Sequence, residues 1–165
     1  MTASVGPKNA RRGRLLIVGP VPPPLNGVTV MTVASLGGGL EDQFDVVYTE
    51  TSDHRTVGSF DPTNVVLALR HAAEFAALLR RHRADLVYLS LSQGLAGFLR
   101  DAMFLMAARV TRARVMVHAH GANFGDFYRR SPATLRGFMR AASVSVADIV
   151  VLAESQLETG LVHAL

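Results

Sequence analysis

The chain has 165 residues, of which 49% are hydrophobic, so it has the size and composition of one domain with a well-buried core. It contains no cysteine, which excludes disulfides and thiolate metal sites and suits a cytosolic protein. Lysine and arginine exceed aspartate and glutamate by 17 to 13, an excess that favours anionic ligands but falls short of a nucleic-acid-binding signature.

The chain begins with small, polar and basic residues that no apolar signal-peptide core follows. We therefore expect residues 1–13 to form a flexible tail and residues 14–165 to form one domain. The uncharged stretch 15–40 has the length of a membrane span, but its prolines at 20 and 22–24 exclude a continuous helix. These features predict a cytoplasmic protein.

Apolar runs and helical repeats alternate along the rest of the chain. In order, the sequence predicts a strand at 14–19, a helix at 28–36, a strand at 44–49, a polar surface loop at 51–62, a helix at 62–83, a strand at 85–91, a helix at 94–112 and a strand at 114–117. A helical turn at 123–130, a helix at 132–146, a strand at 148–153 and the start of a helix at 154–163 follow. Strands and helices at this spacing indicate right-handed βαβ crossovers. The predicted fold class is therefore α/β, with a doubly wound parallel sheet of Rossmann-like type.

Two of the predicted helices carry a candidate buried side, which in the first of them recurs every three or four residues. In the helix at 62–83 one side is formed by the apolar residues Val66, Leu69, Ala73 and Ala76 or Ala77, and Arg80 continues the same spacing. The basic cluster 80–83 at its end is interpreted as a solvated helix end that complements the helix dipole, with contact to phosphate or lipid as the alternative. In the helix at 94–112, the stripe of Phe98, Met103, Phe104 and Met106 is predicted to face the core, and a membrane-binding face is the alternative.

The loop after the first strand is the first candidate binding element. It is stiffened by proline and ends in Asn26 and Gly27, where a positive φ is easily reached, ahead of a predicted helix. Backbone N–H groups at the start of that helix could meet an anionic or hydroxyl-rich ligand. The alternative is an inert turn.

The strand at 114–117 leads into the second candidate element, which contains His118, His120, Gly121 and Asn123. Side chains two residues apart on a strand share a face, so both histidines are predicted to point the same way. Ligands of open parallel sheets bind beyond the carboxyl ends of the strands, which makes this pair the best site candidate. The alternative is that one histidine is only a hydrogen-bonded residue at a strand end.

Several kinds of site lack their sequence signature. There is no G-x-x-x-x-G-K-[ST] phosphate loop, no G-x-S-x-G elbow and no G-x-G-x-x-G fingerprint, although Glu50 follows the second strand where a ribose-binding acid could lie. His118 and His120 could supply two metal ligands, but a third would have to come from Asp126 or a distant carboxylate, and no spacing nominates one. We expect no metal and no bound cofactor.

Both candidate loops resemble those of one known family. The stretches I-V-G-P-V-P-P-P-L-N-G-V and V-H-A-H-G-A-N-F-G-D-F-Y are similar to the N-terminal, acceptor-side domain of family-4 glycosyltransferases, retaining enzymes of the GT-B fold that use nucleotide-sugar donors. In that family the first loop commonly reads P-P-x-x-G-G, so Gly27 keeps the second glycine and Asn26 replaces the first. The family histidine beside the reacting sugar matches His120, with His118 as the alternate.

The resemblance implies a function for the whole chain. It implies a hexosyltransferase with His120 and His118 as catalytic residues and with Asn26, Gly27, Gly121 and Asn123 as substrate-binding residues. The implied partners are a nucleotide sugar and a glycan or lipid-linked acceptor, with weak contact to the inner face of the membrane and no nucleic acid. A GT-B enzyme also has a second, nucleotide-sugar-binding domain that this sequence does not contain, so we expect a fragment, a truncated form or the product of a split gene, inactive alone. The alternative is a non-catalytic binding or interaction module.

Overall fold

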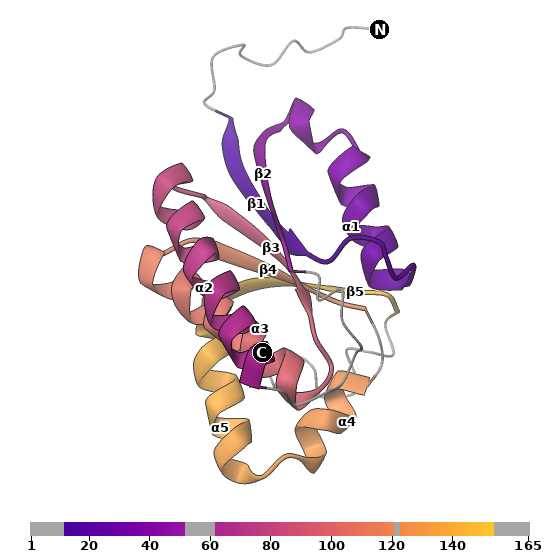
Figure 1. The fold of residues 1–165 in the computed structure, drawn as a ribbon, viewed down its shortest axis with the longest axis vertical. Coiled ribbons are helices and arrows are strands. Elements are labelled where there is room, and N and C mark those ends of the chain that lie inside the picture. The colour runs from indigo at the N-terminus through magenta and orange to yellow at the C-terminus, as the bar shows by residue number, and fades with distance from the viewer. Residues whose placement is uncertain (1–11, 52–61, 121–122, 154–165) are drawn as a thin grey trace, which may run out of the picture.

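The computed structural model describes residues 12–51, 62–120 and 123–153 (Figure 1). Its strands are β1 (Gly13–Gly19), β2 (Phe44–Glu50), β3 (Leu86–Leu91), β4 (Arg114–Ala119) and β5 (Val146–Val151). Its helices are α1 (Gly27–Gly37), α2 (Pro62–His82), α3 (Leu95–Thr111), α4 (Asn123–Arg130) and α5 (Ala133–Ala142), with short 3-10 segments η1 (Leu40–Asp42) and η2 (Ser143–Ser145). The strands form one parallel sheet in the order β2-β1-β3-β4-β5. The predicted α/β fold with a doubly wound parallel sheet is confirmed.

The two faces of the sheet differ in chemistry. One face carries Val18, Leu89 and Val117, which pack into a continuous apolar core with α2, α3 and α5. Helix α1 lies on the other side of the sheet from α2 and α3 (Figure 1). Because side chains alternate along a strand, the positions between those core residues face α1, and they include Tyr88 and His118. Most of the apolar core is therefore on one side, and the polar strand residues are on the other, together with the buried Leu15 and Ile17 of β1.

Helix α2 forms as predicted, but the stripe Val66, Leu69 and Ala73 is not its buried side. Val66 and Leu69 are 65% and 55% exposed, whereas Phe75 and Leu79 are fully buried against the sheet. Both sides of this helix carry apolar residues at helical spacing. The side with the larger aromatic ring faces the core, because burying a phenylalanine side chain contributes about 1.5–3 kcal/mol.

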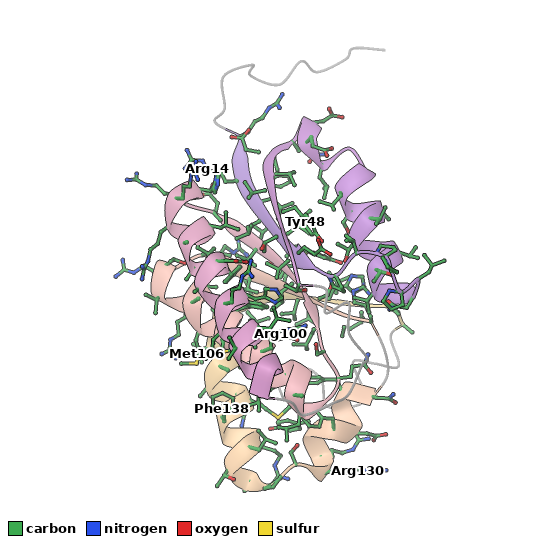
Figure 2. All side chains as sticks on the ribbon, viewed as in Figure 1. Arg14, Tyr48, Arg100, Met106, Arg130 and Phe138 are labelled. Atoms are coloured by element: carbon green, nitrogen blue, oxygen red, sulfur yellow. The ribbon has the colours of Figure 1, made fainter. Side chains whose placement is uncertain are left out.

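Helix α3 buries Phe98 and Phe104 as predicted, but Met106 is 52% exposed (Figure 2). The ring of Phe98 packs at 6.0 Å from Phe124 of α4 and at 6.4 Å from Phe138 of α5. Aromatic pairs at these separations prefer such tilted and edge-on geometries. Phe98 thus joins the three helices that follow β3 and β4.

The ends of several elements differ from the sequence-based expectation. The helix predicted at 132–146 ends at Ala142, and the η2 turn follows, where the hydroxyl of Ser145 donates to the backbone oxygen of Leu105 at 3.2 Å. This contact turns the chain into β5, which starts at Val146 rather than at 148. Gly13, placed in the tail by the sequence, is the first residue of β1. The predicted helix at 154–163, residues 1–11 and most of the predicted loop at 51–62 lie outside the described residues.

Candidate functional site

The strand order places a topological switch point between β1 and β3. The chain leaves β1 toward the face covered by α1, and it leaves β3 toward the face covered by α2 and α3. In doubly wound sheets, ligands bind in the crevice that opens where successive connections part in this way. Gly19 ends β1 at this point, and Ser90 lies near the end of the neighbouring β3.

Gly19 is required here by a close approach of α1. A Cβ atom at this position would lie 2.7 Å from Oγ1 of Thr32 and 3.4 Å from Oγ of Ser90. The backbone oxygen of Gly19 accepts a hydrogen bond from the hydroxyl of Tyr48 at 3.0 Å (Figure 2). Any larger residue would push α1 away from the sheet, so Gly19 fixes the floor of the crevice.

The two histidines on the α1 side of β4 form a stacked pair. The ring centroids of His118 and His120 are 3.9 Å apart, with an angle of 27° between the ring planes. A hydrogen bond joins Nδ1 of His118 to the hydroxyl of Tyr88, and Nε2 of His120 lies 3.3 Å from Oγ of Ser90. The prediction that both histidines share one face of the strand is confirmed.

Burial keeps these rings uncharged. It lowers the pKa of His118, which is 3% exposed. Burial, and next the charge of neighbouring His118, lowers the pKa of His120 to about 4. Burial also raises the pKa of Tyr88, against a smaller opposite effect of a hydrogen bond with Ser35. At neutral pH the pair therefore presents neutral imidazoles, each with one donor and one acceptor nitrogen.

One nitrogen of the pair is buried without a partner. Nε2 of His118 makes no hydrogen bond within the described part of the chain. An unpaired buried polar atom costs about 1–3 kcal/mol. A ligand or water that reaches this nitrogen would recover that cost, which fits a binding role for the pair better than a purely structural one.

Asn26 and Gly27 have a different backbone conformation from the one expected. Asn26 has φ −150° and ψ 174°, and Gly27 is the first residue of α1, so the expectation of a positive φ at this pair is wrong. The side chain of Asn26 caps α1 by accepting from the backbone N–H of Thr29 at 3.0 Å, and the Thr29 hydroxyl accepts from the Asn26 backbone N–H at 3.0 Å. This capping box occupies the amide oxygen, so ligand contact at this loop falls to backbone N–H groups.

Asn123 is the first residue of α4, and its backbone N–H donates to Oε1 of Gln93 at 3.1 Å. The loop that carries Gln93 is anchored by the fully buried Asp101, whose Oδ2 accepts from the backbone N–H of Ser92 at 2.7 Å. Arg100 pairs with the other carboxylate oxygen of Asp101 at 2.8 Å. The start of α4 is thus tied to the end of β3. Gly121 lies outside the described residues.

Sequence reasoning missed two members of the site, Tyr88 and Ser90. Both lie on β3, facing α1, and β3 pairs with β4 so that Ser90 is opposite His118. The signal was present as a second pair of polar residues, two apart, in an otherwise apolar strand. Their contact with the histidines depends on strand pairing across 30 residues, which the sequence alone does not specify.

Within residues 12–51, 62–120 and 123–153, no group of three or more His, Cys, Asp or Glu side chains is placed to hold a metal ion. In the same part of the chain, no helix has both the length and the apolar character needed to cross a bilayer. The comparisons with known proteins find no family model that matches this chain and no curated protein with a significant match. The geometry of the site is therefore the main basis for a functional proposal.

Proposed function

We propose that this domain is the acceptor-side half of a nucleotide-sugar-dependent glycosyltransferase. The observation that carries the proposal is the group of hydrogen-bonding side chains beside the switch point, made by Tyr88, Ser90, His118 and His120. Sugar hydroxyls both donate and accept hydrogen bonds, so hydroxyl groups and neutral imidazoles match them well. The stacked rings also offer a rigid wall that needs little ordering when a ligand binds.

His120 is assigned as a residue that positions the sugar rather than as a general base. General-base catalysis is most effective when the pKa of the base lies near the working pH, and the pKa of His120 is about 4. Within the described residues, Nδ1 of His120 makes no hydrogen bond, while Nε2 is directed to Ser90. Nδ1 is therefore the atom that we expect to contact a sugar hydroxyl.

The remaining features of the proposal rest on the resemblance of the two loop sequences. They are retention of stereochemistry, a nucleotide-sugar donor held mainly by a second domain, a glycan or lipid-linked acceptor, and a cytoplasmic location at the inner face of the membrane. Transfer requires donor and acceptor to be held close together in a closed cleft. We therefore propose that the chain of 165 residues transfers no sugar by itself.

The proposal is tested by adding a second domain in trans. A product assay with a panel of nucleotide sugars is run on the full chain alone and together with a nucleotide-sugar-binding C-terminal domain of the GT-B type. We expect turnover only with both halves, and a loss of more than tenfold for His120→Ala. The matched control is Arg130→Ala, because Arg130 is exposed at the end of α4.

Two results would contradict the proposal. The first is turnover by the lone chain, or micromolar affinity of the lone chain for a nucleotide sugar in calorimetry, which would mean that the donor site lies within these residues. The second is an active pair of halves in which His120→Ala stays within threefold of the parent. That result would remove the histidine pair from the site.

A non-catalytic interaction module is the second candidate function. It is favoured by an exposed apolar stripe on α3, where Leu95, Leu99, Met106 and Val110 are 39–76% exposed at helical spacing. Apolar surface of this kind favours association with another protein. Light scattering across a range of protein concentrations tests it, since a monomer at every concentration would rule out self-association through this stripe.

A further inference from the structure

A surface hollow of about 680 Å³ lies at the amino-terminal edge of the sheet, at the opposite end of the strands from the histidine pair. Its walls come from the last turn of α2, the end of α3 and the start of β4. Four arginines line this hollow, which we call the arginine hollow: Arg80, Arg83, Arg112 and Arg114. All four are exposed to solvent.

Little negative charge balances these arginines. Asp85 is the one carboxylate that lines the hollow among the described residues, and its Oδ2 accepts a hydrogen bond from the backbone N–H of Arg14 at 2.9 Å. Arg114 contacts Asp148 at 3.5 Å, with both side chains largely in solvent, so this pair is weak. The other three arginines make no ion pair within the described part of the chain. The hollow therefore has a positive potential.

Two of the arginines occupy a backbone conformation that favours glycine. Arg83 has φ 48° and Arg112 has φ 60°, and each follows the last residue of a helix. This position usually holds glycine, because a Cβ atom is disfavoured in the left-handed region. Strained positions of this kind are found where the side chain serves a function. Both arginines face the same hollow.

Complementing the helix dipole does not account for this arrangement. The guanidinium of Arg14, on β1, already donates to the backbone oxygen of His82 at 2.9 Å, so the end of α2 has a cation from another element (Figure 2). Helix α3 carries Arg109 in its last turn. A single cation near each helix end would be enough for the dipole, whereas here arginines converge from three elements.

We propose that the arginine hollow binds a phosphate group. Guanidinium groups are planar, permanently charged and suited to paired hydrogen bonds with phosphate oxygens. The hollow is independent of the proposed sugar site, because it lies at the opposite edge of the sheet. The phosphate could belong to a free ion or to a lipid headgroup, and the experiment separates these two sources.

The test uses the full chain and the double variant Arg83→Gly/Arg112→Gly. Calorimetry at low salt measures affinity for inorganic pyrophosphate, and co-sedimentation measures binding to phosphatidylglycerol vesicles, with phosphatidylcholine vesicles as the neutral reference. The matched control is Arg130→Ala/Arg140→Ala, which removes the same charge from exposed positions on α4 and α5. Figure 2 shows Arg130 at the opposite end of the molecule from Arg14.

We expect the glycine variant to lose at least tenfold in affinity while the control stays within twofold. Pyrophosphate binding without vesicle binding assigns a free phosphate ligand, and salt-sensitive vesicle binding without pyrophosphate binding assigns a headgroup. The proposal is overturned if neither probe binds at low salt, or if both double variants lose affinity equally. Should the glycine variant fail to fold, Arg80→Gln/Arg114→Gln is measured in its place. A loss of at least tenfold in affinity supports the proposal, and a loss equal to that of the control overturns it.

Discussion

Acidification should destabilise this protein through His120. The pKa of His120 is lowered from 6.5 to about 4 on folding, because burial and then the nearby His118 disfavour the charged ring. The folded state therefore binds fewer protons than the unfolded state between these two values. The free energy of unfolding is therefore highest above pH 6.5, where the ring is neutral in both states. It falls as pH drops from 6.5 toward 4, because only the unfolded state takes up the proton.

The size of the effect follows from the shift. A change from 6.5 to about 4 corresponds to about 3 kcal/mol at full strength. Solvent reaches part of the His120 ring, so screening reduces the expected loss to about 1–2 kcal/mol. The pKa of His118 is lowered in the same direction and adds to the loss.

The assay compares the parent chain with His120→Gln, whose amide can still hydrogen-bond to Ser90 but does not titrate in this range. Urea unfolding gives the free energy of unfolding of each protein at pH 7.5 and at pH 4.5. The parent should lose about 1–2 kcal/mol more than the variant over this interval. Parallel losses in the two proteins, or a ring NMR signal of His120 that titrates near pH 6.5, would refute the reasoning.

Three further predictions concern folding alone, and urea unfolding measures each of them. Asn26→Ala removes the cap of α1 and should cost about 1 kcal/mol, whereas Asn26→Asp should cost much less; equal losses would argue against capping. Asp101→Ala leaves Arg100 and a backbone N–H without their buried partner and should cost about 3 kcal/mol, so a loss below 1 kcal/mol would be too small for this role. Arg112→Gly relieves a left-handed φ and should stabilise by about 0.5–1 kcal/mol, net of the greater freedom of glycine in the unfolded chain; destabilisation would show that the arginine side chain supports the fold.

The sequence predicts the order and type of the elements well because each strand is an apolar run between turn residues. It predicts less well which side of a helix is buried. In α2, Val66 and Leu69 repeat at helical spacing just as Phe75 and Leu79 do, and periodicity alone does not rank the two sides. The outcome depends on the volume that the sheet and α3 leave to be filled, which is a property of the assembled fold.

The candidate site was predictable where its signal is local. The spacing of His118 and His120 placed both on one face of a strand, and the structure bears this out. Ser90 was missed because it meets His120 only through the pairing of β3 with β4. The backbone conformation of Asn26 was predicted wrongly because an asparagine before a helix suits either a positive φ or an N-cap, and the hydroxyl of Thr29 decides for the cap.

The separation of an apolar face from a polar face of the sheet has a consequence for how this protein can evolve. Most of the buried apolar residues lie with α2, α3 and α5 on one side, and substitutions there affect folding. The hydroxyl and imidazole groups at the crevice lie on the other side, toward α1. Side chains such as Ser90 and His120 can therefore be exchanged with little effect on the apolar core. A library randomised at Ser90 and His120, with Gly19 kept, should retain a large fraction of folded members, so new ligand preferences can be selected on this scaffold.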